Sequence, residues 1–285
     1  MHVFRSTKSF RRWRNSQVSH VGTIGFVPTM GALHEGHRSL IRHANRMCDI
    51  VIVSLFINPL QFGPSEDLNR YPSQPHADQR LCRQEGVTAM FLPSHEEVYP
   101  TGFQTSVTVS HLTSRWEGEC RPTHFRGVAT VVTKLLNVVQ PNVIFFGQKD
   151  YQQTLVITQL VKDLNLDVKV IMCPTRRESD GLAYSSRNQL LSSGLRKKAP
   201  LLYQALMTGE KAIHSGERSS VRILTLMKRT LLNTPPISID YLAICRSKNL
   251  EPVTYIEDKI VMLGAIRLGK VRLIDNLLVR VPHTS

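Results

Sequence analysis

The feature that most constrains the fold is an alternation of short apolar runs and helix-patterned segments through the first two-thirds of the chain. Residues 50–57 form a near-continuous apolar run that ends at an Asn-Pro turn signal. Such a run is typical of a parallel strand that is covered on both faces. Residues 36–47, just before it, carry apolar side chains at helical spacing. Together these segments predict βαβ units, which imply a parallel sheet with right-handed crossovers.

The same alternation continues downstream and then changes. Further strands are predicted at 23–28, 89–92, 143–146 and 168–172, further helices at 77–84, 128–139 and 151–164, and a small antiparallel excursion at 107–109. After about Arg176, helical patterns at 195–214 and 221–232 precede strand patterns at 237–245 and 260–268. We therefore expect an α/β fold, with a parallel-sheet domain over residues 1–176 and a smaller α+β C-terminal domain over residues 177–285.

The charge balance leaves two classes of function open. Lys and Arg number 36 against 22 acidic residues, which gives a net charge of +14. A nucleic-acid-binding module would concentrate this charge in a stripe with interleaved aromatic residues. An enzyme with polyanionic substrates needs only a local positive cleft. The basic residues are spread from Arg5 to Arg280 and only 7% of residues are aromatic, so the motifs must decide.

Three sequence features bear on the cellular compartment. The five cysteines are odd in number, scattered and never spaced as C-x-x-C, which indicates reduced thiols in a cytoplasmic protein. No apolar run approaches the roughly 20 residues that a membrane-spanning helix needs. Residues 4–16 are rich in Arg and Ser and contain no acid. This segment is compatible with either a mitochondrial transit peptide or a short basic surface helix.

The first motif is PTMGALHEGH at residues 28–37, where a predicted strand gives way to a helix. Ligands bind at the carboxyl ends of parallel strands, and a helix N-terminus there favours phosphate. Gly31 and Gly36 let the backbone approach a ligand closely. His34 and His37 share one face of the helix start and can donate to phosphate oxygens. The alternatives are two surface histidines without a role, or a metal site that lacks a clear third ligand.

Three further motifs occupy similar positions. In FINPLQFG, Gln61 and Asn58 offer neutral groups suited to a hydroxy acid, although a structural turn is also compatible. In GQKDYQQ, Lys149 can act as a point charge on a triphosphate. Asp150 can balance it, bind ribose or Mg²⁺ through water, or cap the helix. The segment RRESDGLAYSSRN, at residues 176–188, is either a phosphate clamp built on Arg187 or an interdomain loop.

Taken together and in order over residues 23–190, these motifs resemble the pantothenate synthetase family. The block RPTHFRGV at 121–128 resembles it too, although the family often has Gly at Thr123 and commonly has Arg at Ser73. The resemblance implies a nucleotidyltransferase-like Rossmann domain, with the smaller domain covering the cleft, and a homodimer. It also implies an ATP-dependent ligase that condenses pantoate with β-alanine through a pantoyl adenylate. AMP and pyrophosphate are released, in the biosynthesis of pantothenate and coenzyme A.

By position, the resemblance also implies the site residues. The catalytic residues are His37 as proton donor, His34, Lys149 and Arg187. Gln61 and Gln153 bind pantoate, and Gln61 also lies near β-alanine. The residues implied to bind ATP are Met30, Gly31, Ala32, Leu33, His34, Glu35, Gly36, His37, Gly147, Gln148, Lys149, Asp150, Arg176, Tyr184, Ser185, Ser186 and Arg187. Mg²⁺ accompanies ATP without an assigned protein ligand, and neither nucleic acid nor a membrane is an expected partner. A different nucleotidyltransferase, such as a cytidylyltransferase, is the nearest alternative.

Overall fold

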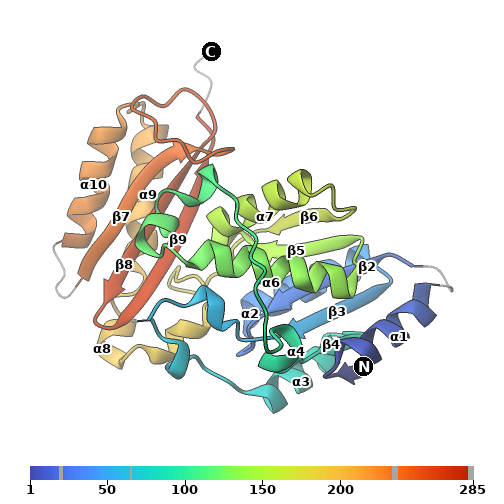
Figure 1. The fold of residues 1–285 in the computed structure, drawn as a ribbon. Helices are drawn as coiled ribbons and strands as arrows, with labels where there is room; N and C mark the ends of the chain where they lie inside the picture. Colours follow the sequence, from blue (N-terminus) through green and yellow to red (C-terminus); the bar gives the residue numbers. More distant parts are fainter. Residues whose placement is uncertain (19–21, 65, 233–236, 282–285) are drawn as a thin grey trace. The chain divides into compact units, whose positions relative to one another are not determined.

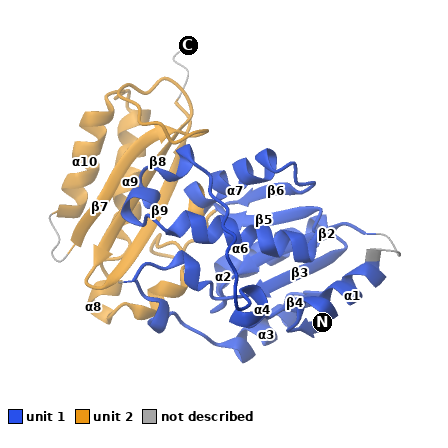
Figure 2. Ribbon diagram, viewed as in Figure 1, with its two compact units in different colours: residues 1–148, 152–174 blue, residues 149–151, 175–285 orange. Residues whose placement is uncertain are grey.

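The structure is a computed structural model that describes residues 1–18, 22–64, 66–232 and 237–281 (Figure 1). The chain forms two compact units (Figure 2). Unit 1 consists of Met1–Gln148 and Gln152–Pro174, and unit 2 consists of Lys149–Tyr151 and Thr175–Ser285. The short segment Lys149–Tyr151 therefore belongs to unit 2, although the residues on both sides of it belong to unit 1.

Unit 1 is built on a parallel sheet. Its six strands in the described residues are β1 (His2–Phe4), β2 (Ile24–Thr29), β3 (Ile50–Leu55), β4 (Ala89–Phe91), β5 (Val143–Gly147) and β6 (Lys169–Cys173). They lie in the order β1-β4-β3-β2-β5-β6, and every neighbouring pair is parallel. The chain reverses its direction of travel across the sheet between β2 and β5. Such a switch point is where open α/β sheets bind ligands, so the loops after Thr29 and Gly147 are the expected place for a site.

Helices cover both faces of this sheet. The helices are α1 (Thr7–Val18), α2 (Glu35–Met47), α3 (Pro75–Gln84), α4 (His95–Val98), α5 (Glu117–Cys120), α6 (His124–Val139) and α7 (Tyr151–Asp163). Neighbouring residues of β2 point to opposite faces, so Phe26 packs with α1, α6 and α7, whereas Val27 packs with α2 and α3. Short 3-10 turns are η1 (Pro59–Gln61), η2 (Leu68–Arg70), η3 (His111–Thr113), η4 (Gln148–Asp150) and η5 (Ser186–Leu190).

Unit 2 contains an antiparallel sheet with helices packed against it. The strands are β7 (Ile237–Arg246), β8 (Ile260–Leu268) and β9 (Val271–Val279), in that order, and the helices are α8 (Ser193–Arg196), α9 (Leu201–His214) and α10 (Ser220–Leu232). Leu206 of α9 and Met227 of α10 are fully buried in the core formed with the sheet. On β7, Asp240 accepts hydrogen bonds from Arg267 and Arg272 at 2.9 and 2.6 Å.

The predicted fold class is confirmed, with two local corrections. The single helix predicted over 195–214 is wrong, because Pro200 has no N–H to donate and α9 begins only after it. The excursion predicted at 107–109 is also wrong, because no strand forms there. Instead, the N–H of Val107 donates to Thr130 Oγ1 at 3.0 Å. Within the described residues, no helix combines the length and the apolar character needed to cross a membrane.

Candidate active site

The loop after β2 follows a backbone path that favours glycine. Gly31 has a φ of +89°, and Ala32 has a φ of +51° although it carries a Cβ. Thr29 ties the start of this loop to the sheet: its Oγ1 accepts from the N–H of Gly31 at 3.2 Å and donates to Ser54 O on β3 at 2.8 Å. The loop is therefore held in a strained conformation at the carboxyl end of the central strand.

A buried carboxylate on α3 holds the same loop. Asp78, which is only 2% exposed, accepts hydrogen bonds from the N–H groups of Ala32 (2.9 Å) and Leu33 (2.8 Å). Burial raises the pKa of the Asp78 carboxyl, and the two backbone donors oppose that rise. Both donors lie at least 45 residues away in the sequence, and nothing around Asp78 distinguishes it from a surface acid of an amphipathic helix. Sequence reasoning therefore missed it.

Two histidines form a capping box at the start of α2. His34 Nδ1 accepts from the N–H of Gly36 at 3.2 Å, and His37 Nδ1 accepts from the N–H of His34 at 3.3 Å. A ring nitrogen that accepts a hydrogen bond carries no proton, so each neutral ring holds its proton on Nε2. The ring centroids lie 4.1 Å apart. The pair can thus donate from Nε2 beside a helix N-terminus, where an anion is stabilised.

Charged residues of α2 tie this helix to the end of α3. Glu35 pairs with Arg42 at 2.8 Å, so its carboxylate is engaged within the protein. Arg42 and Arg38 both bind Glu85, at 2.8 and 2.6 Å. Asp78 therefore fixes the loop, and Glu85 fixes the helix that follows it.

Gln61, in the η1 turn after β3, has an oriented amide. Its Oε1 accepts from Asn58 Nδ2 at 3.2 Å, and its Nε2 donates to the Met30 sulfur at 2.8 Å. A thioether is a weak acceptor, so a carboxylate or hydroxyl oxygen would be a better partner for this N–H. The structure thus brings together two residues predicted for different ligands, Met30 and Gln61.

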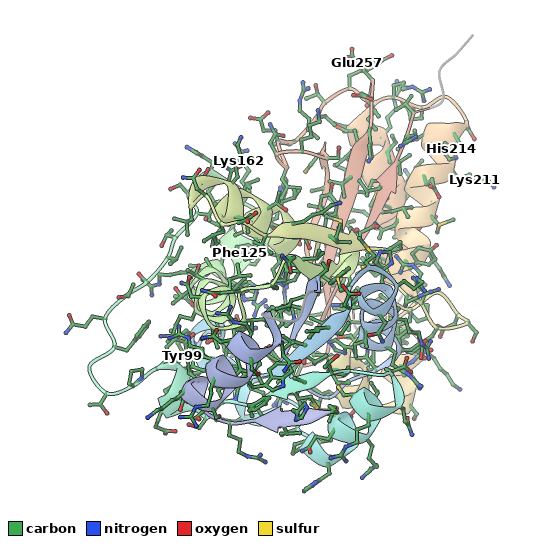
Figure 3. The ribbon with its side chains drawn as sticks, turned by 90° about the vertical axis from the view of Figure 1, so that its right-hand side faces the viewer. Tyr99, Phe125, Lys162, Lys211, His214 and Glu257 are labelled. Atoms are coloured by element: carbon green, nitrogen blue, oxygen red, sulfur yellow. The ribbon has the colours of Figure 1, made fainter. Side chains whose placement is uncertain are left out.

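Asn58 fixes that orientation and has no group left for a ligand. It is 1% exposed, and its Nδ2 also donates to Gly127 O at 3.0 Å. Its Oδ1 accepts from the N–H of Leu60 at 3.3 Å and from the hydroxyl of Tyr99, labelled in Figure 3, at 2.8 Å. Asn58 therefore orients the Gln61 amide.

The RPTHFRGV block holds the main chain of the same turn. Arg121 donates to Gln61 O at 3.4 Å and binds both carboxylate oxygens of Glu66, at 2.9 and 2.6 Å. His124 Nδ1 lies 3.0 Å from Gln61 O. Burial, with a smaller effect of Arg121, lowers the pKa of His124 to about 4, so the ring is neutral and Nδ1 must carry the donated proton. This explains a block to which the sequence motifs assigned no role.

The two glutamines of α7 differ in their contacts. Gln152, 4% exposed, accepts from the N–H of Glu117 at 3.2 Å and donates to Leu112 O and Arg115 O at 2.8 and 2.9 Å. It therefore fixes the loop before α5. The next residue, Gln153, is half-buried. It remains the predicted pantoate ligand of this helix.

Lys149 and Asp150 belong to unit 2. Lys149 Nζ lies 3.7 Å from Asp150 Oδ1, the charge-balancing arrangement considered from the sequence. Asn276 Nδ2 donates to Lys149 O at 3.0 Å, and the Tyr151 hydroxyl donates to Ser247 O at 2.7 Å. These contacts attach the segment to β9 and to the residues after β7.

Residues 176–184 form a tight hairpin that leads into η5. The N–H of Tyr184 donates to Arg176 O at 3.0 Å. Ser185 caps η5, because its Oγ accepts from the N–H of Arg187 at 3.3 Å. The predicted phosphate clamp is thus a capped turn that starts directly after a hairpin.

The predicted site residues are divided between the units. Unit 1 carries Met30, Gly31, Ala32, Leu33, His34, Glu35, Gly36, His37, Gln61, Gly147, Gln148 and Gln153, and unit 2 carries Lys149, Asp150, Arg176, Tyr184, Ser185, Ser186 and Arg187. Among the described residues, no group of three or more His, Cys, Asp or Glu side chains could hold a metal ion. Imidazole, ammonium and guanidinium donors suit a polyphosphate, and the Gln61 amide suits a hydroxy acid.

Comparison with known proteins identifies the family. The chain matches the family model described as pantoate-beta-alanine ligase over residues 2–278. Pantothenate synthetase from Carboxydothermus hydrogenoformans is 46% identical over 282 residues, covering 99% of this chain and 100% of that protein. A crystal structure of pantothenate synthetase from Thermus thermophilus has a TM-score of 0.93 at 44% identity, covering 97% and 99% of the two chains. The Francisella tularensis ligase, complexed with beta-gamma ATP and beta-alanine, has a TM-score of 0.82 at 36% identity, covering 98% and 97%. The chain therefore belongs to the pantoate–beta-alanine ligase family.

Proposed function

We propose that this chain joins pantoate to β-alanine in an ATP-dependent reaction, through a pantoyl adenylate. Family membership over almost the whole chain supports this function. The structural observation that carries it is the oriented Gln61 amide beside Met30, in the same unit as the His34–His37 capping box. One group of donors suits a hydroxy acid, and the other suits the phosphates that activate it.

The first half-reaction gives the pantoate acyl group a leaving group, AMP. A carboxylate cannot acylate an amine directly, because oxide would have to leave. The pantoate carboxylate oxygen therefore attacks the α-phosphorus of ATP, a P–O bond forms, and the bond to the bridging oxygen breaks as pyrophosphate departs. We assign His34, His37, Lys149 and Arg187 to offset the charge that grows on pyrophosphate, with His37 as the proton donor from Nε2.

We assign backbone and side-chain donors of both units to ATP. The residues assigned to ATP are Met30, Gly31, Ala32, Leu33, Glu35, Gly36, Gly147, Gln148, Asp150, Arg176, Tyr184, Ser185 and Ser186, in addition to the four catalytic residues. Glu35 would contribute its main chain, since Arg42 engages its carboxylate. The Asp78 contacts support this arrangement because they hold the loop after β2 in a fixed conformation.

The second half-reaction uses the acyl adenylate. The neutral amine of β-alanine attacks the acyl carbon, the C–N bond forms, the amine loses a proton, and AMP leaves with the electrons of the C–O bond. We assign Gln61 and Gln153 to pantoate and Gln61 also to β-alanine. No covalent enzyme intermediate is needed, because AMP is itself the leaving group.

The remaining expectations are part of the same proposal. Mg²⁺ would enter with ATP, and the phosphate oxygens would supply most of its ligands, since Mg²⁺ is commonly held by substrate phosphates and water. The enzyme would act in the cytoplasm, an expectation supported by five cysteines that are all free thiols. A homodimer is proposed from the family resemblance.

Pyrophosphate release tests the function. The protein is mixed with ATP and Mg²⁺, with and without pantoate, and β-alanine is then added. Pantoate-dependent release of pyrophosphate, followed by AMP and pantothenate when β-alanine is added, is the expected result. Release with another acid or another nucleotide, but none with pantoate, would retain the nucleotidyltransferase chemistry and overturn the substrate assignment.

A further inference from the structure

The segment Lys149–Tyr151 is attached to the C-terminal strand of the chain. Its neighbours in sequence, β5 and the body of α7, belong to unit 1, but the segment itself belongs to unit 2. Asn276 Nδ2, on β9, donates a hydrogen bond to Lys149 O at 3.0 Å. Asn276 is 1% exposed, so its amide is committed to protein contacts.

Asp275, the residue before Asn276, holds the hairpin of residues 176–184. Asp275, 5% exposed, accepts two hydrogen bonds from the Arg177 guanidinium, at 2.5 and 3.0 Å. Arg177 also donates to Asn276 O at 3.4 Å, and its guanidinium carbon lies 3.7 Å from the centre of the Tyr203 ring. Arg177 is therefore a structural cation, although it lies in the Arg- and Ser-rich motif that suggested phosphate binding.

The two attachments have a shared origin. Arg177 belongs to the hairpin of residues 176–184, which leads directly into Ser185 and Arg187. Consecutive residues of a strand project to opposite faces of the sheet, so Asp275 and Asn276 can hold two different segments at once. A bidentate arginine–carboxylate pair and a buried amide contact both restrict geometry tightly. The pair thus fixes the spacing between the main chain of Lys149 and the hairpin that precedes Arg187.

We propose that Asn276 is a positioning residue for ATP, acting through Lys149, and that Asp275 does the same for the 176–187 segment through Arg177. Neither residue needs to touch the nucleotide. This inference rests on the proposed function, because it takes Lys149 and Arg187 as ligands of the triphosphate. It adds that their relative placement is set by two adjacent residues of β9.

A double-mutant cycle tests the inference. Asn276→Ala, Lys149→Ala and the double variant are compared in single-turnover pyrophosphate release with pantoate and ATP. Displacement of Lys149 is expected to slow release in Asn276→Ala by about 10²-fold, the scale of an ångström-sized misplacement. In the Lys149→Ala background, removal of Asn276 should cause no further loss. Additive losses, or an unchanged rate in Asn276→Ala, would overturn the proposal.

Two further variants separate positioning from folding. Asp240→Asn removes the partner of Arg267 and Arg272 in the same sheet, and it should lower thermal stability while leaving the single-turnover rate unchanged. Asn276→Asp keeps the size of the side chain but replaces the donor to Lys149 O with an oxygen, and it replaces Asn276→Ala in the cycle if that variant does not fold. Equal slowing in Asp240→Asn and the Asn276 variants would show a merely structural effect and contradict the proposal. Failure of the wild-type protein to release pyrophosphate with pantoate would instead refute the proposed function.

Discussion

Single side chains determine where positive charge and protons lie in the proposed phosphate site. We expect His37→Ala and Lys149→Ala each to slow adenylate formation by about 10²-fold or more, because each removes a preorganised donor to the leaving pyrophosphate. Single-turnover pyrophosphate release measures this step. His214→Ala and Lys162→Ala are matched controls, since both side chains are exposed (Figure 3). Near-normal rates in both site variants would contradict the assignment.

The Gln61 amide makes a different prediction. Gln61→Ala should raise the KM for pantoate by about tenfold, the scale of one lost hydrogen bond, with little change in the KM for ATP. Steady-state kinetics with each substrate varied in turn distinguishes the two effects. A pantoate KM equal to that of the wild-type protein would count against the role of Gln61.

Residues whose signals are local could be predicted, and residues whose partners are distant could not. His34 and His37 lie three residues apart, so the sequence alone places them on one face of a helix start. Asp78 contacts a loop 45 residues away, and Asn276 contacts a main-chain oxygen 127 residues away. Only the folded chain brings these pairs together, so the sequence motifs could not predict the contacts that support the candidate site.

Among the elements, α6 can approach η1 closely because residue 127 is a glycine. A Cβ on Gly127 would lie 2.2 Å from Leu60 O, in the backbone of the turn that carries Gln61. We expect Gly127→Ala to reduce the free energy of unfolding by about 1–3 kcal/mol through overpacking. It should also weaken pantoate binding, because η1 must move. Chemical denaturation and pantoate titration measure the two effects.

A control for this substitution lies on α8. Gly194 has no neighbouring atom within 4 Å of an added Cβ. Gly194→Ala should therefore change the free energy of unfolding by no more than a few tenths of a kcal/mol, and it should leave pantoate binding unchanged. If Gly127→Ala behaves like Gly194→Ala, the close approach of α6 to η1 has no energetic importance.

The central strands β2, β3 and β5 could be predicted because they are largely buried and read as apolar runs. The three-residue strand β1, which is partly exposed, was not predicted. The helix over 195–214 was predicted too long. Apolar residues continue at helical spacing on both sides of Pro200, and this pattern was given more weight than the N–H that Pro200 lacks. Strand β9 was not predicted, and its sequence shows why. Asp275 and Asn276 are residue types that strands disfavour, and here they are retained for contacts with Arg177 and Lys149.

The whole molecule carries 36 basic against 22 acidic residues, so protonation of its carboxylates at low pH increases the net positive charge. We therefore expect its stability at low pH to depend on carboxylates that are paired with arginine. The hydrogen bond from Arg42, with a further one from Arg38, lowers the pKa of Glu85 below its ordinary value of 4.5. A lowered folded-state pKa stabilises the protein above the unfolded value, and this stabilisation is lost as the pH falls through the folded pKa. Glu85→Gln should therefore lower stability at neutral pH and flatten the loss of stability below pH about 4.5.

Unfolding free energy measured by denaturation at several pH values checks this expectation. Glu257→Gln, which removes an exposed carboxylate, serves as the comparison (Figure 3). Indistinguishable pH profiles for Glu85→Gln and the wild-type protein would show that the pairs between α2 and the end of α3 do not govern acid stability.

The attachment of Lys149–Tyr151 to unit 2 also bears on biosynthesis. A ribosome makes Lys149 127 residues before Asn276, so the nascent chain can complete the β2–β5 region of its parallel sheet well before the partner of Lys149 exists. Strand β9 thus completes a segment that is synthesised well before it. A polypeptide released shortly before β9 would have made every predicted ATP ligand, yet lack the strand that joins Lys149 to the segment of Arg187.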